Sequence, residues 1–292
     1  MPPGILAGQN RICPPDPGGT LLPPQRETAT RHARPGRPIA MMKLKKELTL
    51  PAVGLSGFET PLAEEEAAVQ AGVHRFARDV MRPLGAQLDR MTADEVIAPG
   101  SPYYSIFTEY AKLGLDPAML AELPAEIAVR MESLIGEELG WGDAGLAVSL
   151  IVAGFPMQMA AVLGNQELVG LCTGKIGCWM ITHPDKGSDV TMVDVRPELP
   201  TGQQGNKGNM WGRLQGDEIV INGQCSAWVS NGAVAQVALG YLSAEYEDGF
   251  FGRDGNPYGM AVIIPLDLPG VSKGRPLDKL GQRALPQGEI YF

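Results

Sequence analysis

Residues Ile176–Val190 read IGCWMITHPDKGSDV and combine a short apolar run with a polar loop. The run Ile176–Ile181 is too short for a helix and is bounded by Gly174 and Pro184, which predicts a buried strand. The polar loop Thr182–Asp189 begins where that strand ends. Because loops held by a rigid strand often carry binding groups, this strand end is a candidate site.

A second stretch of the same kind, EIVINGQCSAWVSNG, spans Glu218–Gly232. It holds an apolar strand, an Asn-Gly turn at 222–223 and a polar exit. Taken alone, each stretch is interpreted as a sandwich strand with a core tryptophan. The ordered pair indicates more, because both stretches bring a tryptophan and a hydroxyl residue to a strand end: Trp179 with Thr182, and Trp228 with Ser230.

The pair resembles the middle domain of the acyl-CoA dehydrogenase family, FAD enzymes that desaturate acyl-CoA thioesters. The family's aromatic-x-aliphatic-Thr-Glu-Pro-x-x-Gly-Ser-Asp signature stands here as WMITHPDKGSD, Trp179–Asp189. Its Asn-Gly-x-Lys-x-Trp-Ile-Thr-Asn-Gly signature stands as NGQCSAWVSNG, Asn222–Gly232. A third stretch, KLGQRALPQGEIYF at Lys279–Phe292, is similar to the family's Lys-x-Gly-x-Arg segment. The resemblance covers roughly Leu62–Phe292.

The resemblance implies a set of site residues. The cofactor-binding set lies along the flavin edge and consists of Trp179, Ile181, Thr182, Trp228 and Ser230. Ser188 matches a residue at the entrance for the acyl-CoA thioester. Two simpler interpretations remain open, because Thr182 could cap a turn and Ser188 could form a local backbone hydrogen bond. No metal ligand is assigned.

Three positions and one spacing depart from the family pattern. His183 replaces the usual Glu and is interpreted as an exposed loop histidine, and Ser230 replaces the usual Thr. Cys225 replaces the usual Lys, and the spacing from Gly223 to Trp228 is one residue longer than usual. Because no histidine partner is identifiable near Cys225 in the sequence, a small buried hydrophobe is a better interpretation than a nucleophile.

Composition narrows the class of protein. A chain of 292 residues with 44% hydrophobic and 20% charged residues is long and apolar enough for two globular domains. The net charge of −9 argues against a nucleic-acid or anionic-membrane surface. The 4 cysteines and 3 histidines show no metal-type spacing, so a reduced, cytoplasmic protein without a metal is expected.

Three segments are expected along the chain. Residues 1–40 are rich in proline and arginine, which favours a disordered leader or a misassigned start codon, with Met41 or Met42 as the true beginning. Residues 41–175 are expected to form an N-terminal α-helical domain. Residues 176–292 are expected to form a middle β domain that is truncated at its end. The fold class is therefore α+β.

The helical part is predicted from caps and apolar periodicity. The first helix is expected from Thr60, with its end at Pro83 and Gly85. Further helices are expected from Ser101, after Pro124 and after Asp143. The last of these is apolar almost all round and is interpreted as the central helix of a bundle, not as a membrane span.

The β part is predicted from apolar runs between glycine-rich turns, which indicate an antiparallel sandwich or barrel. The expected strands are Gly177–Thr182, Met192–Arg196, Gly208–Gln215, Glu218–Asn222, Val234–Ser243, Tyr258–Pro265 and Gly288–Phe292.

The C-terminal end of the chain departs most from the family. Family members continue into a helical bundle that carries the catalytic glutamate and FAD-holding motifs across a subunit interface. Here the chain stops at Ile290–Phe292, inside an expected strand, which predicts a truncated reading frame or a fragment. No residue is assigned as the catalytic base, and the chain alone is expected to be inactive or nearly so.

By resemblance, the expected function is FAD-dependent α,β-desaturation of an acyl-CoA, with hydride transfer to flavin N5. The expected partners are acyl-CoA, an electron-transfer flavoprotein or similar acceptor, and further copies that form a homodimer or homotetramer at full length. Two alternatives stay open. One is an acyl-CoA oxidase-like flavoprotein or a related flavin monooxygenase, and the other is a non-catalytic partner subunit or pseudoenzyme.

Overall fold

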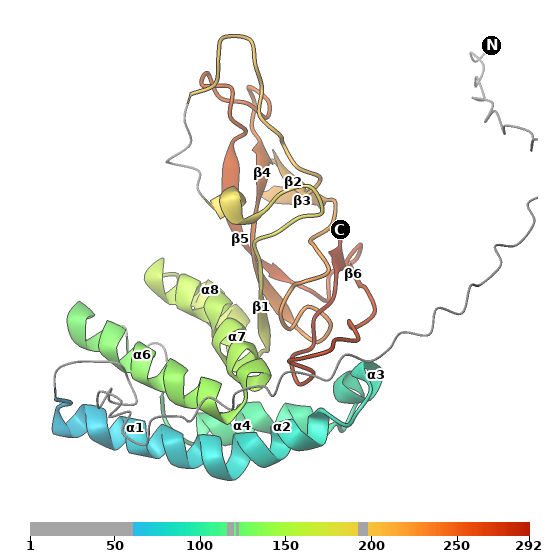
Figure 1. Ribbon diagram of the computed structural model, residues 1–292. Coiled ribbons are helices and arrows are strands. Elements are labelled where there is room, and N and C mark those ends of the chain that lie inside the picture. Colours follow the sequence, from blue (N-terminus) through green and yellow to red (C-terminus); the bar gives the residue numbers. More distant parts are fainter. Residues whose placement is uncertain (1–60, 116–119, 121–122, 192–197) are drawn as a thin grey trace, which may run out of the picture. The chain divides into compact units, whose positions relative to one another are not determined.

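The structure is a computed structural model that describes residues 61–115, 120, 123–191 and 198–292 (Figure 1). Contacts divide the chain into two units, Met1–Pro51 and Ala52–Phe292, and every described residue belongs to the second. The predictions for residues 1–40 and for a strand at Met192–Arg196 lie outside the described residues.

The first helical stretch ends later than predicted, and Thr60, its expected start, lies outside the described residues. Helix α1 (Glu64–Phe76) continues through a π-helical turn, Ala77–Met81, into α2 (Arg82–Leu88). The expectation that Pro83 and Gly85 end the helix is wrong. Pro83 lies in the first turn of α2, directly after a π-type hydrogen bond from Arg82 N–H. Such a wide turn shifts the backbone hydrogen-bonding pattern of the helix, so that the N–H group that proline lacks is not needed.

Five further helices and one 3-10 turn follow before the first strand among the described residues. They are α3 (Ala93–Ile97), the 3-10 turn η2 (Pro102–Tyr104), α4 (Ser105–Ala111), α6 (Ala125–Gly142), α7 (Ala144–Val162) and α8 (Gln166–Cys172). The helices expected from Ser101, after Pro124 and after Asp143 are present, whereas α3 and α8 were not predicted.

Helix α7 connects the helices to the sheet. Its N-cap is Asp143, whose side chain accepts a hydrogen bond from Leu146 N at 2.8 Å. The helix packs against α6, α8 and β1 (Gly177–Met180), as Figure 1 shows. By length and composition alone α7 is apolar enough to cross a membrane. The apolar surface of α7 predicts a helix that is buried on all sides, but this is not observed: Ile151 is 43% exposed and Val162 is 75% exposed.

Among the described residues, the main sheet has five strands in the order β1-β4-β2-β3, with β5 on the other edge of β4. The remaining strands are β2 (Trp211–Gln215), β3 (Glu218–Asn222), β4 (Val237–Glu245) and β5 (Gly259–Pro265), with β6 (Ser272–Lys273) and β7 (Ile290–Tyr291) in a separate pair.

Strand pairing makes the main sheet mixed, so the antiparallel expectation is confirmed only in part. β1 runs parallel to the first half of β4, and β2 runs parallel to its second half. The pairs β2–β3 and β4–β5 are antiparallel. Together with the helices this confirms the α+β class. The domain boundary between residues 175 and 176 stays a prediction.

The described part of the chain buries two apolar cores. One is formed by the helices around Tyr103, Leu139 and Leu146. The other lies in the β region around Cys178, Met210 and Ile290. Burial of such side chains is the main stabilising contribution to each part.

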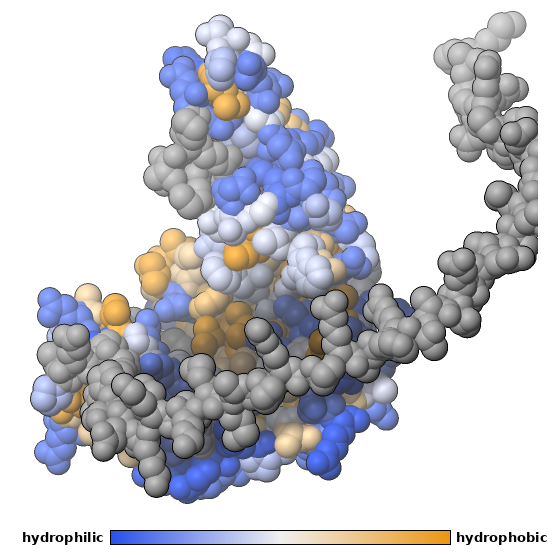
Figure 2. Space-filling model, viewed as in Figure 1, coloured by the Kyte–Doolittle hydropathy of each residue, from blue (hydrophilic) through white to orange (hydrophobic). Residues whose placement is uncertain are grey.

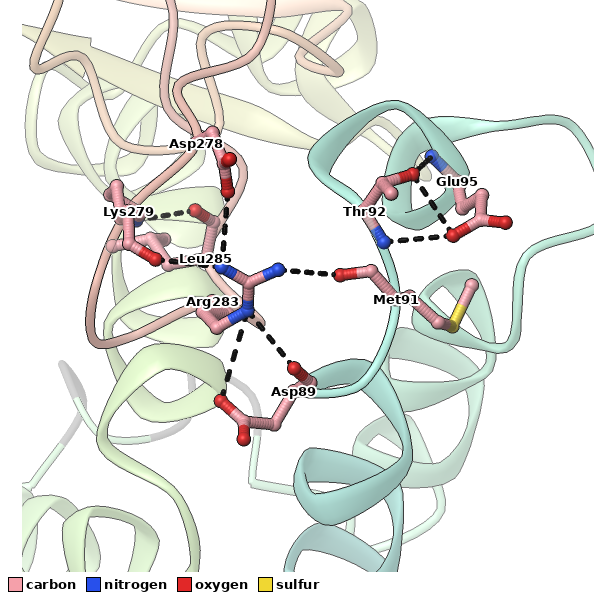
Figure 3. Close-up of polar contacts among 8 residues, drawn as sticks. All are labelled: Asp89, Met91, Thr92, Glu95, Asp278, Lys279, Arg283 and Leu285. Carbon is pink, nitrogen blue, oxygen red and sulfur yellow. Dashed lines mark hydrogen bonds and ion pairs between the residues drawn. The ribbon is translucent and has the colours of Figure 1, made fainter.

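Arg283, the arginine of the third motif, joins the helical region to the C-terminal segment (Figure 3). Its guanidinium donates to the backbone oxygens of Asp89 at 3.0 Å and Met91 at 2.9 Å, in the turn between α2 and α3. It also donates to Lys279 O at 2.8 Å and to the carboxylate of Asp278 at 3.0 Å. A planar guanidinium can donate several hydrogen bonds at once, and here these bonds hold two segments of the fold together.

Candidate functional site

The first two sequence motifs meet at the end of β1. The pairing of β1 with β4 extends to Met180, so Ile181 and Thr182 lie just beyond it. The Thr182 and Ser226 hydroxyls share a short hydrogen bond, and Ser226 N donates to Thr182 O at 2.9 Å. Ser226 belongs to the second motif, so a residue 44 positions away fixes the Thr182 backbone and side chain.

Asn231 ties the second motif to the start of β1 and to α7. Its side-chain Nδ2 donates to Gly177 O at 3.2 Å and to Ser149 O at 2.9 Å. Its Oδ1 accepts from the hydroxyls of Ser149 at 2.7 Å and Tyr103 at 3.1 Å. Asn231 is fully buried and has a φ of 63°, a left-handed conformation that asparagine tolerates better than most residues.

The third motif reaches the second through Gln287. Its side-chain Nε2 donates to Trp228 O at 2.9 Å and faces Ser230 Oγ at 3.4 Å. The three stretches therefore lie in one hydrogen-bonded arrangement, which we name the motif cluster: Gly177, Thr182, Ser226, Trp228, Ser230, Asn231 and Gln287.

The predicted site residues differ in exposure. Trp179 packs edge-on against Phe155 of α7, with ring centroids 4.8 Å apart, and its buried Nε1 has no hydrogen-bond partner among the described residues. Trp228 is 67% exposed, so the interpretation as a core tryptophan does not hold for it. Ile181, Thr182 and Ser230 are half-buried.

Ser188 does not belong to the motif cluster. It is exposed and begins a 3-10 turn, Ser188–Thr191, in which the Thr191 hydroxyl donates to Ser188 O at 2.9 Å. Its predicted role at an acyl-CoA entrance stays a prediction.

Sequence reasoning missed Ser226, Asn231 and Gln287 as members of the cluster. Each acts through a partner at least 44 residues away in the chain, so local periodicity carries no trace of the contact. Asn231 offered one usable signal: an asparagine before glycine at a strand exit often adopts the left-handed conformation.

His183 is not the exposed loop histidine that was expected, because only 4% of it is exposed. Its Nε2 lies 3.0 Å from Tyr241 O, a pure acceptor, so Nε2 carries the hydrogen. Its Nδ1 is buried and has no partner among the described residues. Burial lowers the pKa of His183, although the hydrogen bond to Tyr241 O acts in the opposite direction.

Acid should therefore destabilise the protein through His183. A histidine whose pKa is lower in the folded state stabilises fully above its unfolded pKa of about 6.5, and this contribution is lost as the pH falls below that value. We expect His183→Gln, which keeps a donor for Tyr241 O, to reduce the loss of unfolding free energy between pH 7.5 and pH 5.5. Denaturant unfolding at both pH values measures it, and identical losses in the two proteins would refute the assignment.

Cys225 matches the interpretation as a small buried hydrophobe. It is fully buried, and its Sγ accepts a hydrogen bond from Ile290 N at 3.1 Å. Burial raises the pKa of Cys225 to about 12, which disfavours the nucleophilic thiolate.

Apolar cavities line α7. One of about 210 Å³ lies between α6 and α7 and is lined by Leu139, Leu150, Ile151 and Phe155, among others. Another, also of about 210 Å³, is lined by Phe155, Val162 and Trp179, so it adjoins the first motif. Figure 2 shows hydrophobic residues exposed over α7 and α8. An apolar ligand would find complementary surface here.

Curated proteins of known activity match most of the chain. Benzylmalonyl-CoA dehydrogenase of Aromatoleum aromaticum (strain DSM 19018 / LMG 30748 / EbN1) is 25% identical over 241 residues, which cover 79% of this chain and 55% of that protein. The mitochondrial short-chain specific acyl-CoA dehydrogenase of Rattus norvegicus is 24% identical over 244 residues, 79% of this chain and 51% of that protein. The chain is similar to these acyl-CoA dehydrogenases over most of its length.

The fold comparison agrees with this relationship. A solved structure of a glutaryl-CoA dehydrogenase from Mycobacterium smegmatis in complex with FADH2 has a TM-score of 0.54 and 22% identity, covering 79% of this chain and 53% of that one. No family model matches the chain. The chain spans about half the length of the curated relatives it matches. The family resemblance drawn from the three motifs, and the acyl-CoA dehydrogenase fold, are thus confirmed.

Proposed function

We propose that this chain forms the flavin-facing part of an FAD-dependent acyl-CoA dehydrogenase. The observation that carries the proposal is the motif cluster, in which hydrogen bonds join the second motif to both ends of β1 and to the third motif. Each of these hydrogen bonds taken alone could serve only to hold the fold together. The similarity to acyl-CoA dehydrogenases favours a flavin site for the whole arrangement.

The residues present fit a flavin. Trp179 offers a buried indole N–H without a partner among the described residues, which is costly unless a ligand supplies an acceptor. Thr182, just beyond β1, and Ser230, in the loop between β3 and β4, add half-buried hydroxyls, and the exposed Trp228 adds an aromatic face. Polar groups beside apolar surface are the usual lining of a cofactor site.

Bound FAD would supply the hydride-accepting chemistry of α,β-desaturation. The chain's own residues would bind and orient the ring: Trp179, Ile181 and Thr182 from the end of β1, and Trp228 with Ser230 from the second motif. The Thr182 and Ser230 hydroxyls can donate hydrogen bonds from fixed positions, and such preorganised donors stabilise charge as it develops. The apolar cavities along α7 suit an acyl chain.

The remaining parts of the proposal concern the substrate, the electron acceptor, the assembly and the location. An acyl-CoA thioester is the proposed substrate, with Ser188 at its entrance, and an electron-transfer flavoprotein or similar protein is the proposed acceptor. Assembly as a homodimer or homotetramer and a cytoplasmic location complete it. No catalytic base is assigned.

Replacement of Thr182 tests the flavin assignment. We expect Thr182→Val to weaken FAD binding about three- to tenfold, because one hydroxyl contributes a net hydrogen bond of about 0.5–1.5 kcal/mol. Fluorescence titration with FAD measures the dissociation constant. Thr173→Val is the matched control, since that exposed hydroxyl donates only to Val169 O within α8 and its C-cap. Equal affinities for the two variants would remove Thr182 from the site.

A further inference from the structure

The Gln287 side chain bridges a half-buried lysine and the second motif. Its Nε2 donates to Trp228 O at 2.9 Å and faces Ser230 Oγ at 3.4 Å. Its Oε1 accepts a hydrogen bond from Lys279 Nζ at 2.9 Å. The bridge thus runs in one direction, from Lys279 through Gln287 to the residues that flank Val229.

The chemistry of the neighbours permits only one orientation of the Gln287 amide. The ammonium group of Lys279 has donors and no acceptor, so the atom that faces it must be Oε1. The carbonyl of Trp228 only accepts, so the atom that faces it must be Nε2. Lys279 is itself held by a second hydrogen bond, to Leu285 O at 2.7 Å. Burial lowers the pKa of Lys279 to about 8, which leaves it mainly protonated at neutral pH.

The backbone holds the same two segments in register. Ser230 and Gln287 form an isolated antiparallel bridge, and Gly288 N donates to Val229 O at 3.3 Å. This pairing fixes the Gln287 backbone beside the second motif and keeps its side-chain amide within reach of Trp228 O and Ser230 Oγ.

The orientation of the Gln287 amide determines whether the Ser230 hydroxyl donates or accepts a hydrogen bond. With an N–H of Gln287 directed at it, the Ser230 oxygen acts as an acceptor toward the protein. Its own hydrogen then remains for a group outside the protein. A serine oriented in this way is a hydrogen-bond donor toward a ligand.

We propose that Gln287, oriented by Lys279, is a positioning residue that directs the Ser230 hydroxyl as a donor toward the bound flavin. The inference rests on the proposed function and adds to it a residue pair outside the first two motifs. Gln287 itself touches no ligand in this arrangement, because its amide is used by Lys279, Trp228 and Ser230.

Three variants and one control test the bridge by FAD titration. Gln287→Met and Lys279→Met should each weaken FAD binding about three- to tenfold and alter the visible flavin spectrum. Gln287→Glu should not restore binding, because a carboxylate can pair with Lys279 but cannot donate to Trp228 O or Ser230. Lys273→Met is the control: the ammonium group of Lys273 also donates to a backbone carbonyl, that of Ala235, but lies outside the bridge. Wild-type affinity in Gln287→Glu, or an equal loss in the control, would overturn the proposal.

The ligand-free protein supplies a second readout. The side-chain amide protons of Gln287 should exchange slowly with solvent in the wild type and faster in Lys279→Met, as NMR can measure. Equal exchange rates would overturn the orienting role of Lys279 and leave the proposed function intact. Failure of the wild-type chain to bind FAD would instead overturn the proposed function, and the flavin role of Ser230 with it.

Discussion

Replacing Asn231 with alanine should lower the free energy of unfolding by about 3 kcal/mol. The side chain donates to two backbone carbonyls, Ser149 O and Gly177 O, and accepts from the hydroxyls of Ser149 and Tyr103. Asn231, Ser149 and Tyr103 are all fully buried, so no water replaces what is lost. Denaturant unfolding of the purified variants measures the effect.

A second variant separates the hydrogen bonds from the backbone conformation. Alanine at position 231 would also be strained by the φ of 63°, whereas glycine adopts this conformation freely. Asn231→Gly should therefore recover about 1 kcal/mol relative to Asn231→Ala and still remain well below the wild type. A glycine variant as stable as the wild type would show that the buried network contributes nothing.

Gly223→Ala should lower the free energy of unfolding by at least about 3 kcal/mol. Gly223 has a φ of 112°, and a Cβ placed there would lie 2.1 Å from Asn209 O, which is backbone and cannot rotate away. Gly223 also exchanges two backbone hydrogen bonds with Phe292, of 3.1 and 2.8 Å. Any shift that relieves the clash would therefore disturb the entry to the second motif. Thermal and denaturant unfolding both report the loss.

Gly249 provides the matched control for Gly223. It has a similar φ of 99°, but nothing lies within 4 Å of an added Cβ. Gly249→Ala should cost about 1 kcal/mol, the strain of the left-handed backbone alone. Equal losses at the two glycines would contradict the close approach of Asn209 to Gly223.

Local signals in the sequence predicted most of the elements. Asp143 marked the start of α7 because a side-chain cap depends only on residues next to it. Strand β3 begins and ends at Glu218 and Asn222, as its apolar run and the Asn-Gly turn indicated. The prediction that the helix ends at Pro83 was wrong for a physical reason. A π-type turn before Pro83 shifts the backbone hydrogen-bonding pattern of the helix, and that turn has no sequence signature.

The candidate site was predictable only in part. The two tryptophans and two hydroxyls were singled out because they repeat a pattern. Thr182 does lie at the end of β1, but Trp228 and Ser230 lie in the loop between β3 and β4, so the prediction of a strand end there is wrong. The burial of His183 and the links through Ser226 and Gln287 depend on segments that meet only in the folded chain. The parallel pairing of β1 with β4 is likewise a property of topology, because each strand alone carries only an apolar run.

Titration of the purified chain with FAD tests the central claim most directly. Binding can be followed by quenching of tryptophan fluorescence, with Trp228→Phe used to isolate the signal of the exposed Trp228. We predict saturable one-to-one binding, a perturbed flavin absorption spectrum, and quenching that is much smaller in Trp228→Phe. A folded chain that shows no saturable binding and leaves the FAD spectrum unchanged would contradict the claim that the motif cluster is a flavin site.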